Sequence, residues 1–228
     1  MTKTLQSVTD SRTAETRGGD SCPALGSGAR SKFKTIVADP PWHYGAGYPA
    51  PENRPNSNPG VPNPMPYPTM TLAEIKALPV AELADDDCEL YLWTTQKYLP
   101  DAFDVVKVWG FRYCGTLTWC KTPRGTGQGG LYCPTTEFIV HARRGKMPQG
   151  KPRQDSTWWN QKRTPHSVKP EFFQDVIEAV SDWPRVELFA RRQRLGWATW
   201  GNEAMNHVGL VLPNEGTLRW RAAECEIE

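Results

Sequence analysis

Short apolar runs separated by polar segments predict a chain in which strands alternate with helices. Runs rich in β-branched and aromatic residues predict strands at residues 33–38, 89–94, 112–121, 136–143 and 185–190, with one shorter segment at 197–202. Apolar residues at helical spacing predict helices over 98–109 and 169–181, and a capping box formed by Thr71 and Glu74 opens a third helix that runs to Leu78. The third and fourth strands predict a hairpin. We therefore expect an α/β fold with a mixed central sheet and helices on both faces.

The polar ends and a proline-rich segment divide the chain. Residues 1–31 are rich in Ser, Thr, Gly and charge, which predicts a flexible N-terminal tail, and 213–228 are interpreted as a C-terminal tail. One folded domain is expected over 32–212. Eight prolines in residues 49–68 exclude regular structure there, and a loop of this length inside a compact domain is typical of an active-site or binding loop.

Composition excludes several classes of protein. The 228 residues contain no apolar run long enough for a membrane span, and the first residues lack the apolar core of a secretory signal. The six cysteines form no C-x-x-C pair and the four histidines are scattered, so we expect reduced thiols in a cytoplasmic protein and neither a disulfide scaffold nor a metal site.

Charge is segregated along the chain although the net charge is only +2. Residues 72–104 carry eight acidic and two basic side chains, whereas 121–169 carry ten basic and two acidic ones. The basic segment includes Trp158, Trp159 and His166, a mixture that favours a surface for phosphates and stacked bases. A solvated loop face is the alternative interpretation.

The chemistry is concentrated in Asp39-Pro40-Pro41-Trp42, which follows the first predicted strand. Ligands bind at the carboxyl ends of strands in open α/β sheets. Two prolines remove two backbone donors, so one tight turn combines a carboxylate, carbonyls that can only accept and a large ring. This set suits a flat ligand with an amino group, because two acceptors can take both hydrogens and free the nitrogen lone pair to attack. A proline-rich strand exit with an N-cap aspartate is the alternative.

The run FKTIVADPPW resembles the signature of amino-group methyltransferases that use S-adenosylmethionine. It is most similar to the family of the 70-kDa catalytic subunit of the eukaryotic mRNA adenosine methyltransferase, with its bacterial and phage DNA adenine methyltransferase relatives. Further matches follow in family order at PYPTM (66–70), LYLWTT (90–95), TWCKT (118–122), TEF (136–138), HSVKP (166–170), RVELFAR (185–191) and WGNE (200–203). The resemblance implies a Rossmann-like methyltransferase fold in which the catalytic motif precedes the cofactor segment, a permuted order.

The resemblance also implies roles for individual residues. Asp39 and the Pro40 carbonyl would take the two amino hydrogens, and Trp42 would pack on the base, within the catalytic set Asp39, Pro40, Pro41 and Trp42. Lys169 would pair with the carboxylate of the cofactor, within the cofactor-binding set Asp39, Lys169, Glu187, Phe189, Arg191, Gln193, Asn202 and Glu203. The expected substrate-binding residues are Tyr44, Tyr67, Lys121, Glu137, Arg143 and Arg144. No metal is expected.

The function implied is methyl transfer from S-adenosylmethionine to the N6 amino group of adenine in DNA, in a bacterial or phage-infected cell. Two alternatives stay open: the same reaction on RNA, and a catalytically silent nucleic-acid-binding subunit. Nucleic acid is the expected partner, with DNA favoured over RNA and no membrane, and a homodimer is compatible with the pairing seen in the family. The sequence departs from the family pattern at three places. Gln193 and Arg194 replace a histidine and an asparagine of the eukaryotic enzyme. The zinc fingers of that enzyme are missing, and the proline-rich loop 49–68 is longer than its counterpart.

Overall fold

The computed structural model describes residues 32–43, 68–123, 131–164, 168–201 and 203–204. The predicted tails and nearly all of the proline-rich loop lie outside these residues. The described part contains a seven-stranded sheet in the order β5-β3-β4-β2-β1-β6-β7. Its strands are β1 (Phe33–Ala38), β2 (Ala84–Thr94), β3 (Arg112–Thr122), β4 (Thr136–Arg144), β5 (Trp158–Lys162), β6 (Arg185–Leu188) and β7 (Trp197–Trp200). Only β4 runs antiparallel to its neighbours, β2 and β3, so the predicted mixed sheet and hairpin are confirmed.

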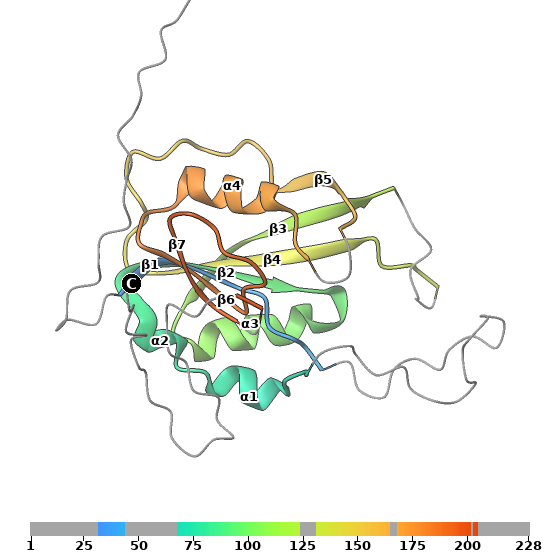
Figure 1. Cartoon of the computed structure of the whole chain (residues 1–228), viewed down its shortest axis with the longest axis horizontal. Helices are drawn as coiled ribbons and strands as arrows, with labels where there is room; N and C mark the ends of the chain where they lie inside the picture. Colours follow the sequence, from blue (N-terminus) through green and yellow to red (C-terminus); the bar gives the residue numbers. More distant parts are fainter. Residues whose placement is uncertain (1–31, 44–67, 124–130, 165–167, 202, 205–228) are drawn as a thin grey trace, which may run out of the picture.

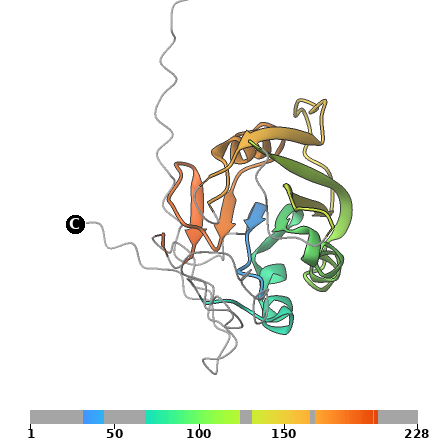
Figure 2. The ribbon, with the colours of Figure 1, turned by 90° about the vertical axis from the view of Figure 1, so that its right-hand side faces the viewer.

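Helices cover both faces of the sheet, as expected (Figures 1 and 2). They are α1 (Leu72–Ala77), α2 (Val80–Leu83), a 3₁₀ turn (Gln96–Tyr98), α3 (Leu99–Val108) and α4 (Glu171–Val180). The first three α-helices lie on one face and α4 lies on the other. The predicted capping box is present, since Thr71 Oγ1 accepts from the backbone N–H of Glu74 while the Glu74 carboxylate accepts from that of Thr71. None of the described helices combines the length and the apolar character that crossing a membrane requires.

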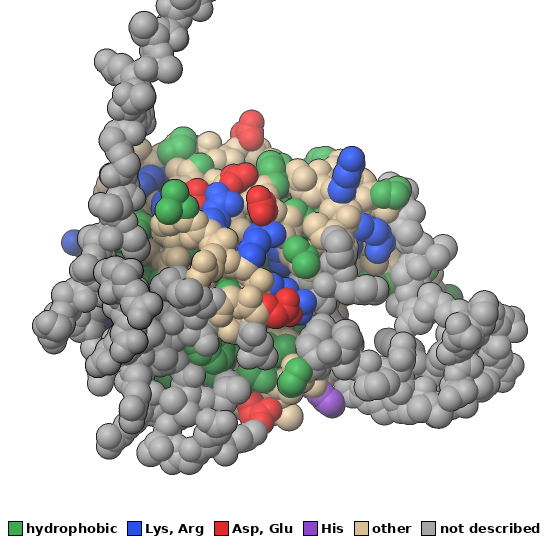
Figure 3. Space-filling view, viewed as in Figure 1, with side chains coloured by type: hydrophobic (Ala, Val, Ile, Leu, Met, Phe, Trp, Pro, Cys, Tyr) green, Lys and Arg blue, Asp and Glu red, His purple; other side chains and the backbone are tan. Residues whose placement is uncertain are grey.

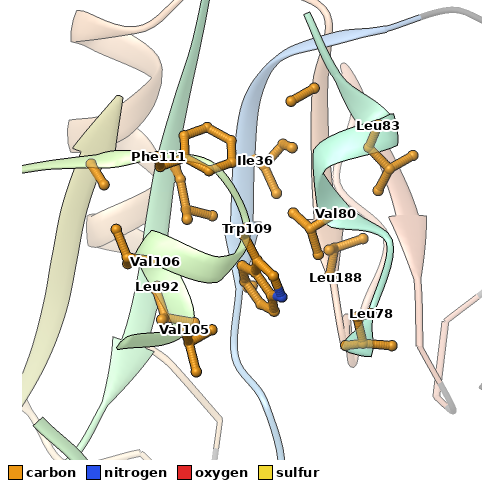
Figure 4. Close-up of a cluster of buried hydrophobic side chains, with 14 of the residues drawn as sticks. Ile36, Leu78, Val80, Leu83, Leu92, Val105, Val106, Trp109, Phe111 and Leu188 are labelled. Carbon is orange, nitrogen blue, oxygen red and sulfur yellow. The ribbon is translucent and has the colours of Figure 1, made fainter. Parts of the chain in front are cut away.

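The alternation of side chains along the strands divides the core into two clusters. Ile36 and Leu92 point to the face of α1–α3, where Trp109 fills the centre of the larger cluster (Figure 4). Trp109 is almost fully buried, and its indole N–H donates to the backbone oxygen of Ile75 over 3.1 Å, so burial leaves no unpaired donor on that ring. On the opposite face Trp93 packs edge-on against Phe173 of α4, with ring centroids 5.2 Å apart.

The structure differs from the sequence-based expectations at β5 and at the ends of two strands. Residues Trp158–Lys162 were interpreted as part of a basic surface segment, but they form an edge strand that pairs in parallel with β3. Trp159 packs against Phe172 and Phe173 of α4, so it contributes to the core while Trp158 stays exposed. A strand this polar is held by its pairing with β3 rather than by an apolar run. β2 begins five residues before the predicted 89–94, and β6 ends two residues before the predicted end at 190.

Candidate active site

Asp39 directly follows β1, the strand that lies between β2 and β6 in the sheet. The three strands run parallel, so their carboxyl ends meet at one edge. The backbone N–H of Asp39 donates to the oxygen of Leu188, the last residue of β6, over 3.3 Å. This bond brings Asp39 next to the segment that follows β6.

The two prolines after Asp39 use their carbonyls to shape the turn. The Pro40 oxygen accepts from the backbone N–H of Trp42 over 2.9 Å, and the Pro41 oxygen accepts from that of Met70 over 2.8 Å. A carbonyl oxygen has two lone pairs, so Pro40 keeps one acceptor position for a ligand. The turn is therefore held rigidly against the residues that precede α1.

Trp42 is placed in the core. The residue is 5 % exposed, and its ring stacks on Tyr98 with centroids 5.1 Å apart. Its indole N–H donates to the backbone oxygen of Trp93 over 3.1 Å. Trp42 lines neither of the cavities beside Asp39, so the structure gives it the position of an anchor for the turn instead of the base-packing surface that the resemblance implies.

Lys169 connects Asp39 to a second acidic residue. Its Nζ lies 2.8 Å from Asp39 Oδ2 and 3.4 Å from Glu137 Oε2, and the other oxygen of Glu137 binds Lys121. The ammonium also lies 5.3 Å from the centre of the Trp93 ring, a cation–π contact. Two carboxylates and two ammonium groups thus form one chain at the edge of the sheet.

Burial and charge act in opposite directions on the central pair. Burial disfavours the ammonium of Lys169, but the carboxylates of Asp39 and Glu137 outweigh it and raise the pKa of Lys169. Burial raises the pKa of Asp39, and the adjacent Lys169 ammonium acts against this rise. Lys169 therefore stays charged and supports the anionic form of Asp39.

Two cavities meet at Asp39. The first, of about 120 Å³, is bounded by the prolines of the turn and by the ends of β6 and β7, and we call it the proline-side cavity. The second, of about 210 Å³, lies between α4 and the sheet, and we call it the lysine-side cavity because Lys169 lines it. Both are lined by Asp39, Phe189, Arg191 and Glu203. Arg191 and Glu203 form an ion pair of 3.4 Å across their shared wall.

The wall at Phe189 depends on an unusual backbone. Phe189 has φ of 64°, a left-handed conformation that costs energy for a side chain with a Cβ and is common at functional sites. This turn ends β6, and the Phe189 ring packs edge-on against Trp200 with centroids 5.2 Å apart. Gly201 approaches so closely that a Cβ there would lie 2.1 Å from the backbone oxygen of Ala190. Only glycine fits where β7 closes on this turn.

A chain of hydrogen bonds holds Glu187 in the lysine-side cavity. Gln174 of α4 donates from Nε2 to Glu187 Oε2 over 2.6 Å, and its Oε1 accepts from Arg192 over 3.1 Å. Because the arginine can only donate, it orients the amide so that the Nε2 hydrogens face Glu187. Burial, followed by repulsion from Asp39, raises the pKa of Glu187 to about 7.

The structure brings most of the predicted site residues together. Six members of the predicted cofactor set line the two cavities: Asp39, Lys169, Glu187, Phe189, Arg191 and Glu203. Lys121 and Glu137, predicted to bind substrate, join the same site through Lys169. Tyr44, Tyr67 and Asn202 lie outside the described residues.

Four basic or polar residues lie elsewhere. Arg143 and Arg144 end β4, at the edge of the sheet opposite Asp39, and Arg144 binds the backbone oxygen of Ala81. Gln193 is exposed and lines neither cavity. Arg194 pairs with Asp175 and Glu178 on α4. On the face of the molecule drawn in Figure 3, acidic and basic side chains lie side by side.

The residues lining the lysine-side cavity that sequence reasoning did not assign to the site include Trp93, Gln174 and Arg192. Gln174 carried a signal, since it is a polar residue beside the apolar stripe of α4 and is 6 % exposed in the structure. Trp93 was included within a buried strand and within the family match LYLWTT (90–95), with no role assigned to it. Nothing in the pattern distinguishes Arg192 from its basic neighbours. Within the described ranges, no group of three or more His, Cys, Asp or Glu side chains is arranged to hold a metal ion.

Comparison with known proteins assigns the chain to a family. Residues 33–203 match the family model described as MT-A70. The chain belongs to the MT-A70 family. Its Asp39 turn, its Lys169 and its β6 end all lie inside the matched region.

The MT-A70 relatives include bacterial and eukaryotic proteins. The Type II methyltransferase M.MunI of Mycoplasma sp is 30% identical over 83% of this chain and 84% of its own length. The human N(6)-adenosine-methyltransferase catalytic subunit METTL3 is 27% identical over 80% of this chain and 30% of its own length. The non-catalytic subunit MTB of Arabidopsis thaliana is 33% identical over 40% of this chain and 11% of its own. This MT-A70 chain therefore spans most of the bacterial relative and under a third of either eukaryotic one.

Proposed function

We propose that this chain transfers the methyl group of S-adenosylmethionine to the N6 amino group of adenine in DNA. The observation that carries the proposal is the 2.8 Å pair of Asp39 and Lys169 at the junction of two cavities. One cavity then accommodates the cofactor and the other the target base, with the acceptor turn between them. Membership in a family with methyltransferase relatives supports this assignment.

The side chains of the lysine-side cavity fit the polar groups of S-adenosylmethionine, which supplies an activated methyl group when bound. The Lys169 ammonium has three donors and uses two on Asp39 and Glu137, so one remains for the carboxylate of the cofactor. Glu187 can accept from ribose hydroxyls through the oxygen that Gln174 does not contact. The Phe189 ring offers an apolar surface to an adenine ring.

The turn after β1 fits the amino group of the target base. The Asp39 carboxylate and the free lone pair of the Pro40 carbonyl can each accept one amino hydrogen. Accepting both hydrogens localises the nitrogen lone pair, and the rigid turn positions it without reorganisation. Asp39 is also placed to receive the proton that the methylated nitrogen releases. Lys169 supports this role by keeping the carboxylate charged.

We take DNA as the substrate, and a relative that is matched along most of its own length, the Type II methyltransferase M.MunI, supports this choice. An amino group inside a duplex cannot reach the turn, so the target adenine must be unstacked or single-stranded. RNA is the second candidate substrate, favoured by the match to METTL3. A silent subunit is the third reading, suggested by the match to MTB, and the complete set of Asp39, Pro40 and Lys169 argues against it.

The test is methyl transfer from tritiated S-adenosylmethionine to DNA and RNA oligomers, each as single strands and duplexes. Digestion to nucleosides and mass spectrometry then identify the modified base. We expect N6-methyladenosine in its deoxy form, and label that appears only in RNA would replace DNA as the substrate. Cofactor binding in calorimetry without transfer to any polymer would favour the silent subunit. A protein that shows no cofactor binding and no methyl transfer would refute the proposal.

A further inference from the structure

A third cavity, of about 470 Å³, lies away from Asp39. It is bounded by α4, by β2, β3, β4 and β5 of the sheet and by residues 147–157, which follow β4, and it opens to the surface. Its volume lies within the usual range for sites that hold small molecules. Ile177 of α4 lines this cavity and the lysine-side cavity, so the two lie on the same face of the sheet. Nothing in the proposed methyl transfer uses this third space.

A stack of two rings forms part of the wall of this cavity. Tyr91 and His141 are direct cross-strand partners, and their rings lie 4.8 Å apart with an interplanar angle of 14°. Glu89 lies two residues before Tyr91 and therefore on the same face. Its Oε2 accepts from the Tyr91 hydroxyl over 3.2 Å and its Oε1 lies 3.1 Å from His141 Nε2. One carboxylate thus holds both rings of the stack.

The groups in this stack have defined hydrogen-bonding roles. A carboxylate can only accept, so we assign a proton to His141 Nε2. Burial and the adjacent carboxylate raise the pKa of Tyr91, which keeps its hydroxyl protonated and donating. Glu89 is almost fully buried, whereas the His141 side chain is 23% exposed and lines the cavity. His141 is therefore a fixed aromatic surface whose exposed part a ligand can reach.

The remaining walls combine apolar surface with a basic rim. Leu117, Val176 and Val180 are among the apolar lining residues. Lys151 and Arg153 lie at the rim on exposed positions. Lys151 pairs with Asp182 over 3.0 Å, which ties the rim to the end of α4, and Arg153 has no ion-pair partner among the residues that the structure describes. An anionic group at the mouth would supply that partner.

We propose that this cavity is a second ligand site that takes a nucleotide, with its base on His141 and its phosphate on Arg153. A planar base matches the ring surface, its N–H groups match the spare lone pairs of Glu89, and its phosphate matches the rim. The nucleotide could be free or part of a nucleic acid chain, since both present the same groups. The site does not depend on methyl transfer.

The first experiment measures binding of uridine 5′-monophosphate by calorimetry, because a pyrimidine differs from the adenine proposed for the catalytic turn. We expect His141→Ala to lower the affinity about tenfold, the usual scale for one stacked base. Arg153→Ala should lower the affinity for the monophosphate and leave that for uridine unchanged. The matched control is Lys107→Ala, an exposed lysine of α3 on the opposite face of the sheet.

Two further measurements complete the test. Binding of a single-stranded thymidine oligomer of about ten nucleotides shows whether the same variants weaken a polymer, which identifies the source of the nucleotide. Photocrosslinking with 4-thiouridine 5′-monophosphate should label peptides from 141–159. Cofactor affinity should stay unchanged in Arg153→Ala. Because Arg153 is exposed, this variant alone tests the proposed nucleotide site if His141→Ala fails to fold. Absence of binding by both probes, affinities unchanged in both variants, or labelling confined to the Asp39 cavities would overturn the proposal.

Discussion

Asp39 Oδ2 and Lys169 Nζ lie 2.8 Å apart although 130 positions separate them in the sequence. The pair joins the end of β1 to the residue before the N-cap of α4. It also stands where the proline-side and lysine-side cavities meet. The proposed chemistry depends on this contact.

Replacing Asp39 with asparagine should reduce methyl transfer by about 100-fold or more, because the amide lacks the charge that accepts the amino hydrogen and the released proton. The side chain keeps its size, so circular dichroism and thermal unfolding should show a folded protein. The matched control is Asp104→Asn, which alters an exposed ion pair with Lys76. A turnover number equal to that of the unmodified protein would contradict the role of Asp39.

Replacing Lys169 with methionine should weaken S-adenosylmethionine binding about tenfold or more, the scale of one hydrogen bond to a charged group. The loss follows from removing the donor that we propose for the cofactor carboxylate. Calorimetry measures the dissociation constant, with Lys76→Met as the control for loss of a charge. If Lys169→Met bound the cofactor as tightly as the control, Lys169 would have no part in holding it.

Glu187 should make the protein less stable as the pH rises. Its pKa is raised from 4.5 to about 7 in the folded state, so between these values the folded protein binds more protons than the unfolded chain. The free energy of unfolding contributed by this group is then largest below pH 4.5 and is lost up to about pH 7. The loss is at most about 3 kcal/mol. Urea unfolding from pH 5 to 8 should show a free energy of unfolding that falls with rising pH, and Glu187→Gln should abolish this fall. An equal fall in the variant would contradict the raised pKa of Glu187.

Gln174 should act on the cofactor through Glu187. In Gln174→Met the carboxylate loses a hydrogen-bond donor, so the pKa of Glu187 should rise further above its usual value. The pH at which cofactor affinity reaches half its maximum should move upward with it. Arg192→Ala should shift this midpoint in the same direction, because the arginine orients the amide of Gln174. A uniform loss of affinity at every pH would indicate a structural role alone.

Gly201→Ala should destabilise the protein by about 1–3 kcal/mol and weaken cofactor binding. The new Cβ would lie 2.1 Å from the backbone oxygen of Ala190, so β7 must move away from the turn that carries Phe189. Gly115→Ala on β3 is the matched control, because its Cβ meets nothing within 4 Å. Urea unfolding and calorimetry measure the two effects, and equal behaviour of the two variants would contradict the close-packing argument.

Local sequence determined much of the fold. The apolar run of β1, the capping box at Thr71 and the apolar face of α4 depend on neighbouring residues, so their periodicity predicts them well. The Asp39 turn was found the same way, because a carboxylate and two prolines directly follow a strand. The family resemblance then pointed to Lys169 and Glu187.

Tertiary structure alone decided the rest. β5 is a polar strand that forms through its pairing with β3. Trp42 was predicted to pack on the target base, but in the structure it packs on Tyr98 beneath the turn. Arg192, rather than Gln193, lines the lysine-side cavity, and both follow the left-handed turn at Phe189. Such contacts join residues that are far apart in the sequence. Because they leave no periodic pattern of apolar and polar residues along the chain, the sequence alone does not predict them.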